Sequence, residues 1–405
     1  MINSKPKNIT LMKRVIMIVA AALLTLSASA QELANFAMGG GAKKTEINAD
    51  GTVTFRFVAP KAIEVLVTGN CFPTEAKEVD WNGRKMTFDM PVPMALKEGP
   101  GGVWEYTTPE PLKPELYTYS FIVDGLNVND PSNPIMQRDG SRYLSVLLVP
   151  GEATENYFEA NKRGNLEKVW YDSKTLGLNR RMYVYTPYGY DKNVKKKYPV
   201  LYLLHGGGGD EDAWSTMGRA CQILDNLIEK GLAVPMICVM PNGNPGQTAA
   251  QTQMIPAKEL DWRAPENQNL YIHSLVKDII PYVESHYRVI AKRDARAIAG
   301  LSMGGGHTLA ASGNYPGTFG YIVPMSCGAQ DTPEMNAQLQ AIKKAGYKLY
   351  QVCCGDADFA YPGTLVLEEL LKRNGLEHTM YINGGGHVWS NWRIYLQEIA
   401  PKLFK

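Results

Sequence analysis

The stretch that decides the fold runs from residue 297 to 305 and has the sequence Ala-Ile-Ala-Gly-Leu-Ser-Met-Gly-Gly. An apolar run typical of a buried strand leads into the pattern Gly-x-Ser-x-Gly, and small residues follow where a helix would begin. Gly300 and Gly304 leave room for a sharp strand-to-helix turn, because neither carries a β-carbon. Such a turn lifts the Ser302 hydroxyl out of the backbone, where a base can take its proton. The stretch therefore predicts a serine nucleophile at the edge of an α/β sheet.

The segments around this turn alternate between strand-like and helical patterns from about residue 165 to the C-terminus. Apolar runs typical of buried strands lie at 200–204, 236–240, 295–299, 321–325, 349–353 and 378–382. Helical patterns lie around 223–228, at 270–286, after Ser302, at 364–373 and from about 389. This alternation predicts a mostly parallel sheet with helices on both faces. Together with the Gly-x-Ser-x-Gly turn, it is typical of an α/β-hydrolase fold. Pro281 falls within the pattern at 270–286, so that helix is expected to kink.

A serine hydroxyl needs a base, and in this architecture the chain order is serine, acid, histidine. Two histidines follow the helix that begins after Ser302, namely His378 and His387. His387 comes directly after three glycines that follow the last strand-like run, which is where a triad histidine is expected. His378 begins that strand-like run and is expected to be an ordinary strand residue. His307, one turn into the helix, is expected to pack against its neighbours.

The acid should follow a strand between the serine and the histidine. Asp356 and Asp358 both come directly after the run at 349–353, and their positions alone do not separate them. Asp331 follows an earlier strand-like run and is the third choice.

Two backbone N–H groups are needed to hold the oxyanion that forms during acyl transfer. One is expected from Met303, the residue after the nucleophile, and the other from the glycine run at 206–209, with Gly207 as first choice and Gly208 as second. The glycine run lacks the Lys-Ser/Thr of a phosphate-binding loop. A serine mechanism of this kind requires no metal or organic cofactor.

The six cysteines are few for 405 residues, and most of them lie in or beside strand-like runs. Buried free thiols are therefore expected. The cysteine spacings do not resemble a zinc site.

The N-terminus carries a different kind of signal. Lys13 and Arg14 precede a short apolar run and a small-residue site, a pattern typical of a secretory signal peptide covering residues 1–30. Removal of this segment would take four basic residues and no acidic one, and so change the formal charge from +2 to −2. We therefore expect a periplasmic or secreted protein with no membrane span in the mature form and no nucleic-acid partner.

Residues 31–152 are expected to form a separate β-sandwich of the immunoglobulin type. Short alternating or β-rich runs are separated by Gly, Pro and Asn clusters, at 53–57, 63–67, 103–108, 116–123 and 144–149. Residues 153–164 are a plausible linker, and the α/β-hydrolase domain spans 165–405. Trp81 and Trp104 fit either a sugar-binding platform or the core of the sandwich.

The α/β-hydrolase region resembles the esterase-D-like members of carbohydrate esterase family 1, the feruloyl and acetylxylan esterases. The stretches that carry the resemblance are 181–187, 202–207, 240–243, 278–284, 300–305 and 385–389. The family's acid follows the pattern Gly-x-x-Asp, which Gly355 and Asp358 match. The resemblance therefore implies Asp358 as the acid that acts with Ser302 and His387.

The N-terminal region is similar to the immunoglobulin-like carbohydrate-binding modules of family 48. The matching stretches are 53–57, 116–125 and 130–134. The resemblance implies a module that either binds glycan or shapes the mouth of the active site.

Together, these resemblances imply a secreted serine esterase that removes feruloyl groups from plant polysaccharide or oligosaccharide esters of the arabinoxylan type. An acetylxylan esterase is the close alternative, since only the size of the acyl pocket differs. A glycan-binding protein with an inert hydrolase domain is a more distant one, and the intact Ser302, Asp358 and His387 argue against it. A peptidase with this fold would usually carry a large propeller or lid.

Candidates for contacts with an aromatic acyl group and its sugar are Trp214, Asp261, Trp262, Phe359, Trp389 and Trp392. Asp261 and Trp262 lie in a long stretch without clear periodicity, and long loops in this fold often cover the site.

Overall fold

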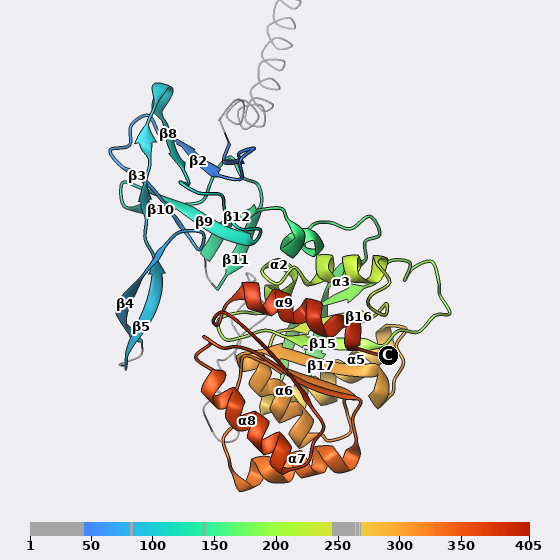
Figure 1. Cartoon of the computed structure of the whole chain (residues 1–405). Coiled ribbons are helices and arrows are strands. Elements are labelled where there is room, and N and C mark those ends of the chain that lie inside the picture. Colours follow the sequence, from blue (N-terminus) through green and yellow to red (C-terminus); the bar gives the residue numbers. More distant parts are fainter. Residues whose placement is uncertain (1–43, 82–83, 141, 245–263, 265–266, 268) are drawn as a thin grey trace, which may run out of the picture. The chain divides into compact units, whose positions relative to one another are not determined.

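A computed structural model describes residues 44–81, 84–140, 142–244, 264, 267 and 269–405 (Figure 1). The predicted signal peptide lies outside the described residues. The chain divides into two compact units. The first reaches Leu112 and includes Tyr119–Pro134, and the second consists of Lys113–Thr118 and Ile135–Lys405. The predicted domain boundaries near 152 and 165 stay predictions.

The described part of the first unit is built mostly from β-strands, as its alternating sequence predicts. In one sheet β2 (Val53–Val58) lies between β1 (Glu46–Ile47) and β8 (Val103–Thr107), and β7 (Lys97–Glu98) pairs with β8. In a second sheet β3 (Val65–Gly69) lies between β9 (Leu116–Val123) and β6 (Met94–Ala95), and β10 (Leu126–Val128) pairs with β9. β4 (Thr74–Trp81) and β5 (Arg84–Pro91) form a two-stranded ribbon.

Buried aromatic side chains fill the core of this first unit. The rings of Phe55 and Tyr119 meet edge to face, with centroids 5.1 Å apart. Trp104 is buried and donates its indole N–H to the Ala59 carbonyl oxygen at 2.9 Å. This tryptophan therefore belongs to the core.

The second unit contains an eight-stranded sheet in the order β13-β14-β16-β15-β17-β18-β19-β20. The strands are β13 (Asn165–Ser173), β14 (Leu178–Thr186), β15 (Val200–Leu204), β16 (Ile237–Pro241), β17 (Arg296–Leu301), β18 (Tyr321–Met325), β19 (Leu349–Gly355) and β20 (Thr379–Asn383). β13 and β14 are antiparallel to their neighbours, whereas all pairings from β16 to β20 are parallel. This confirms the predicted α/β-hydrolase fold. A hairpin of β11 (Met136–Asp139) and β12 (Arg142–Leu148) also belongs to this unit.

The helices of the second unit cover both faces of the sheet (Figure 1). They are α2 (Ala213–Thr216), α3 (Ala220–Glu229), α4 (Leu270–Ser274), α5 (Ile280–His286), α6 (Met303–Asn314), α7 (Pro333–Ala345), α8 (Tyr361–Arg373) and α9 (Trp389–Ile399). Side chains of α4 to α8 contribute to one hydrophobic cluster, and those of α2, α3 and α9 to another.

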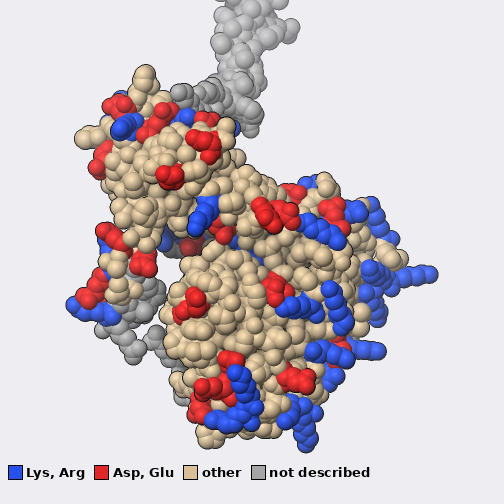
Figure 2. Space-filling view, viewed as in Figure 1, with Lys and Arg blue, Asp and Glu red and all other residues tan. Residues whose placement is uncertain are grey.

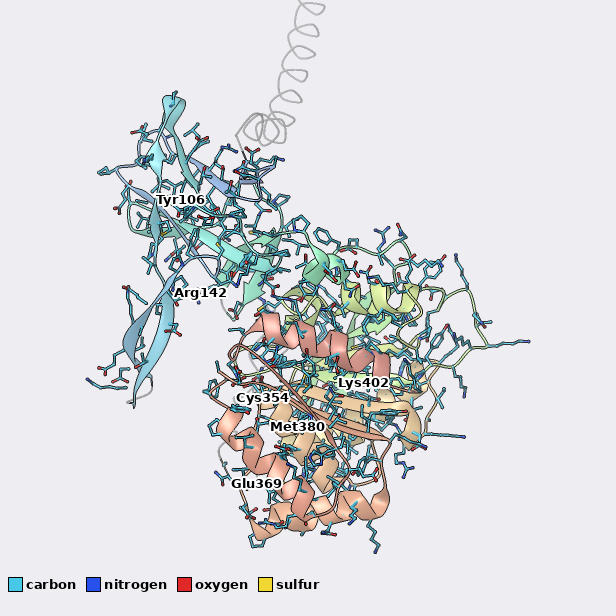
Figure 3. The ribbon with its side chains drawn as sticks, viewed as in Figure 1. Tyr106, Arg142, Cys354, Glu369, Met380 and Lys402 are labelled. Carbon is cyan, nitrogen blue, oxygen red and sulfur yellow. The ribbon has the colours of Figure 1, made fainter. Side chains whose placement is uncertain are left out.

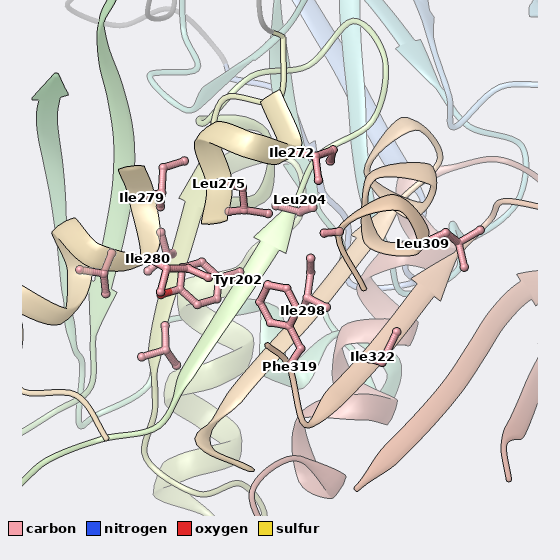
Figure 4. Close-up of a cluster of buried hydrophobic side chains, with 14 of the residues drawn as sticks. Tyr202, Leu204, Ile272, Leu275, Ile279, Ile280, Ile298, Leu309, Phe319 and Ile322 are labelled. Carbon is pink, nitrogen blue, oxygen red and sulfur yellow. The ribbon is translucent and has the colours of Figure 1, made fainter. Parts of the chain in front are cut away.

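The alternation of side chains along β15 explains why the sheet has a hydrophobic cluster on each face. Val200, Tyr202 and Leu204 belong to the first cluster, and Leu201 and Leu203 belong to the second. Figure 4 shows Tyr202 and Leu204 of the first cluster among apolar side chains of the helices. Because both faces are buried, the strand is apolar at every position. Burial of each such side chain contributes roughly 1.5–3 kcal/mol.

The helical pattern at 270–286 is interrupted close to Pro281, as predicted. α4 ends at Ser274, a π-helical turn spans Leu275–Ile279, and α5 begins at Ile280. Proline has no N–H to donate, and its ring clashes with the carbonyl one turn earlier, which explains the widened turn.

Three further features of the described residues bear on the sequence predictions. All six cysteines are free, and four of them are buried. Among the described helices, none is long and apolar enough to cross a bilayer. On the face that Figure 2 shows, the second unit carries both basic and acidic side chains.

Candidate active site

Ser302 occupies a strained turn between β17 and α6, as the Gly-x-Ser-x-Gly pattern predicts. Its backbone angles are φ 53° and ψ −115°, a combination that residues other than glycine rarely adopt. A β-carbon on Gly300 would lie 2.3 Å from the Gly304 carbonyl oxygen, and one on Gly304 would lie 2.6 Å from the His205 carbonyl oxygen. Neither position can therefore hold a side chain, because backbone carbonyl groups approach it too closely.

Asp358 and His387 meet at the carboxyl ends of β19 and β20. The Nδ1 atom of His387 lies 2.9 Å from Oδ1 and 3.0 Å from Oδ2 of Asp358. The Asp358 side chain is fully buried, and that of His387 is 19 % exposed. Of the histidines and acids that the sequence left as candidates, the structure brings this pair together.

The remaining candidates have other partners. Asp356 is exposed, and its N–H donates to the Asn383 carbonyl oxygen. Asp331 forms an exposed ion pair with Arg373. The Nδ1 atom of His378 hydrogen-bonds the Leu376 carbonyl oxygen at 2.8 Å. His307 packs against the Tyr271 ring, with centroids 4.8 Å apart.

Ser326 supports the Asp358 carboxylate, and the sequence analysis missed it. Burial raises the pKa of Asp358, but hydrogen bonds from His387, the Ala360 amide and the Ser326 hydroxyl outweigh burial and hold that pKa below its ordinary value of 3.8. Trp392 in turn donates its indole N–H to the Ser326 hydroxyl oxygen at 2.9 Å. The carboxylate is therefore held in its charged form and in a fixed orientation.

The loop that carries His387 is tied to its surroundings by Asn391. The Asn391 side chain donates to the Gly386 carbonyl oxygen at 2.9 Å and accepts from the Asn383 side chain at 3.0 Å. A β-carbon on Gly355 would lie 2.0 Å from the Gly385 carbonyl oxygen, so the loops after β19 and β20 are in direct contact. This contact brings the acid and the histidine to one place.

Ser326→Ala tests the support of the carboxylate. We expect kcat for ester hydrolysis to fall about tenfold, because the change removes one hydrogen bond to a charged group and leaves the Trp392 N–H without its acceptor. Trp392→Phe keeps the Ser326 hydroxyl and should lower kcat less. Steady-state kinetics of both variants check this expectation, and equal losses would show that Ser326 acts only through packing.

The glycine run at 206–209 lies beside the nucleophile. A β-carbon on Gly206 would lie 3.3 Å from the Ser302 β-carbon. Gly207 is exposed, and a β-carbon on it would have open space around it. The first N–H groups of α6, beginning with Met303, have no acceptor within their own helix. Gly207 and Met303 therefore stay the predicted oxyanion donors.

The aromatic candidates differ in accessibility. Phe359 is 77 % exposed, and its ring centroid lies 4.2 Å from that of His387. Trp389 is half-buried and meets the Trp214 ring edge to face at 5.3 Å. Trp214 is 1 % exposed and donates its N–H to the Leu204 carbonyl oxygen, so a substrate reaches it only if neighbours move. Asp261 and Trp262 lie outside the described residues.

The sequence of this region matches a known protein family. Residues 173–353 match the family model described as "Putative esterase". This part of the chain is therefore similar to that esterase family. The match covers the strained turn at Ser302 and ends just before the loop that holds Asp358.

Proteins similar to this chain share its hydrolase region. The endo-1,4-beta-xylanase/feruloyl esterase of Xylanibacter ruminicola is 31% identical over 367 residues, which are 89% of this chain and 46% of that protein. The ferulic acid esterase of Anaeromyces mucronatus, solved with ferulic acid, superposes with a TM-score of 0.51 at 25% identity and covers 61% of this chain and 93% of that one. The enterobactin esterase of Shigella flexneri shares the fold over 90% of this chain and 97% of its own, with a TM-score of 0.59 at 18% identity. The chain thus spans about half the length of this xylanase/feruloyl esterase relative.

Proposed function

We propose that this chain is a serine esterase in which Ser302, His387 and Asp358 form the catalytic triad. The observation that carries the proposal is the contact between His387 Nδ1 and the buried Asp358 carboxylate, in the same domain as the strained serine turn. The other histidines and acids considered have different partners, which supports this assignment.

In the proposed mechanism His387 accepts the Ser302 proton at Nε2 while the hydroxyl oxygen attacks an ester carbonyl. The N–H groups of Met303 and Gly207 donate to the oxyanion as it forms. His387 then gives its proton to the leaving alcohol, and water repeats the sequence to release the acid. Asp358 holds the imidazole in the tautomer that leaves Nε2 free to accept, and it stabilises the imidazolium.

The proposed substrates are hydroxycinnamoyl esters on plant polysaccharide of the arabinoxylan type. The Xylanibacter relative is named a feruloyl esterase, and the Anaeromyces structure contains ferulic acid. In this chain the exposed ring of Phe359 stands beside His387, where a flat aromatic acyl group could stack on it. Export through the predicted signal peptide would bring the enzyme to such polymers.

The test is hydrolysis by the purified full chain of methyl ferulate, feruloylated arabinoxylan and acetylated xylan, with released ferulate and acetate measured by chromatography. Faster release of ferulate supports the proposed substrate class. Faster release of acetate at a Ser302-dependent rate would replace it with acetylxylan esterase activity. If neither acid is released above the rate of the Ser302→Ala variant, the chain is not an esterase for these substrates.

Phe359→Ala tests the acyl contact. We expect kcat/KM for methyl ferulate to fall about tenfold, because a stacked aromatic pair contributes about 0.5–1.5 kcal/mol beyond the area that it buries. Hydrolysis of an acetyl ester should change less than twofold. Phe158→Ala, at another exposed phenylalanine of the second unit, is the matched control. An equal fall in kcat/KM for both esters would show that Phe359 does not recognise the acyl group.

A further inference from the structure

We infer that Arg138, on the β11–β12 hairpin, is a positioning residue for the oxyanion loop at 206–209. The inference rests on the proposed esterase function, because the loop has a catalytic role only there. The hairpin precedes the α/β-hydrolase region as the sequence delimits it, and it belongs to the same compact unit in the structure.

The loop needs partners outside itself. It contains four consecutive glycines, and glycine loses more conformational freedom on ordering than any other residue. Gly208 has φ +77°, and neither Gly207 nor Gly208 has a neighbour within 4 Å of its β-carbon position. Within the loop, the Gly209 N–H donates to the Gly206 carbonyl oxygen at 3.2 Å and closes a turn over Gly207 and Gly208. Groups from other elements that hold the two ends of this turn therefore set the direction in which the Gly207 N–H points.

One end of the loop is held by His205. Its Nδ1–H donates to the Gly206 carbonyl oxygen at 2.7 Å, and its Nε2 accepts from the Gly243 N–H at 2.8 Å. Burial lowers the pKa of His205 to about 4, so the ring is neutral at pH 7 and can donate and accept at once. The Gly206 carbonyl oxygen, which also accepts the Gly209 N–H, is thereby held at one end of the turn.

The other end of the loop is held by Asp210 and its partner Arg138. The Asp210 side chain is 2 % exposed, and one of its oxygens accepts the Asp212 N–H at 3.0 Å. The other oxygen accepts from Nη2 of Arg138. Asn244 adds a hydrogen bond from its side chain to the Gly209 carbonyl oxygen at 2.8 Å.

Arg138 also fixes the hairpin turn that lies against the loop. Its Nη1 donates to the Gly140 carbonyl oxygen at 2.9 Å. A β-carbon on Gly140 would lie 3.7 Å from the Gly208 carbonyl oxygen. One guanidinium therefore joins the acid that ends the loop to the turn that flanks Gly208, and its planar fork makes both bonds at once.

Gly207, the proposed N–H donor, and its neighbour Gly208 thus lie between two fixed points, His205 and the Arg138–Asp210 pair. Loss of the pair leaves a buried carboxylate without its cation, which favours a rearrangement that exposes Asp210. The Gly207 N–H would then leave the position where the oxyanion forms, while the ester in its ground state would bind as before.

The test compares Arg138→Met, Arg138→Met/Asp210→Asn and Arg142→Met in the full chain. Arg142 is exposed on the same hairpin and serves as the matched control (Figure 3). For Arg138→Met we expect kcat to fall about 100-fold, in the range found for loss of one oxyanion donor, with KM changed less than threefold. The double variant should recover thermal stability but not kcat, and Arg142→Met should match the wild type.

Two results would overturn the inference. One is kcat within threefold of the wild type for Arg138→Met, and the other is recovery of kcat together with stability in the double variant. A wild-type chain that hydrolyses no ester would instead contradict the proposed function. In that event a crystal structure of Arg138→Met still decides, since we expect a displaced Gly208, and an unmoved loop would refute the positioning role.

Discussion

Ser302→Ala is expected to lower kcat for ester hydrolysis about 10⁵- to 10⁶-fold, because no other group can form the acyl-enzyme. The residual rate would come from substrate binding and the oxyanion donors alone. Steady-state kinetics with methyl ferulate and active-site titration with a fluorophosphonate measure the loss. The titration should label the wild type at one residue and the variant not at all.

The same variant should not lose stability. Ser302 has φ 53° and ψ −115°, and a residue in such a region costs about 1–3 kcal/mol of conformational strain. Alanine keeps this strain, whereas Ser302→Gly should relieve it and raise the melting temperature. If Ser302→Ala loses activity at an unchanged melting temperature, the loss is therefore due to the missing hydroxyl and not to unfolding.

Ser312→Ala is the matched control for this experiment. Ser312 is buried in the same helix, and its hydroxyl donates to the Thr308 carbonyl oxygen at 2.8 Å. We expect activity close to that of the wild type. If Ser302→Ala kept more than a hundredth of wild-type kcat, the nucleophile would have to be another residue.

The sequence could predict six of the eight strands of the hydrolase sheet, β15 to β20, because their pattern is set by burial, whereas β13 and β14 were not predicted as strands. The apolar run at 200–204 has no polar position, which only a strand covered on both faces tolerates. The strained turn at Ser302 could be predicted as well, because the pattern Gly-x-Ser-x-Gly is local and a β-carbon on Gly300 would meet the Gly304 carbonyl oxygen. The contacts that require Gly304 come from the distant residues Leu204 and His205.

The helix α7 (Pro333–Ala345) could not be predicted in the same way. Its pattern is mostly polar, and among its residues only Leu339 and Ile342 are buried. Its start is fixed by Thr332, whose side chain accepts the Met335 N–H at 3.1 Å. A helix that packs through so narrow an apolar stripe leaves a weak signal of period 3.6.

The residues around the acid were the hardest to predict, because their roles depend on contacts across the sheet. Asp356 and Asp358 stand two positions apart after one strand, and their positions alone left both open, whereas the family resemblance implied Asp358. The structure separates them, since only Asp358 turns inward to His387 and the Ser326 hydroxyl. Ser326 directly follows a different strand, β18, and nothing in the sequence indicates that its backbone adopts a φ of +47°. Arg138 and Asp210 are likewise 72 positions apart in the sequence, so no local pattern indicates their contact.

Asp358→Asn is expected to lower kcat about 10⁴-fold, because an amide in place of the carboxylate can donate to His387 Nδ1 and so stabilise the tautomer that cannot accept the Ser302 proton. Asp331→Asn, at an exposed ion pair with Arg373, is the matched control and should leave kcat unchanged. If Asp356→Asn rather than Asp358→Asn caused the loss, the acid would have to be reassigned.

The same substitution should also change stability in a pH-dependent way. The pKa of Asp358 is lower in the folded chain than its ordinary value of 3.8, so the charged carboxylate stabilises the fold above that pH. This stabilisation is lost as the pH falls through the still lower folded-state pKa. Urea unfolding should therefore show a larger gap in the free energy of unfolding between wild type and Asp358→Asn at pH 7 than at pH 3. A gap that does not shrink on acidification would mean that the charge of Asp358 contributes nothing to the fold, and that its hydrogen bonds act only on the orientation of His387.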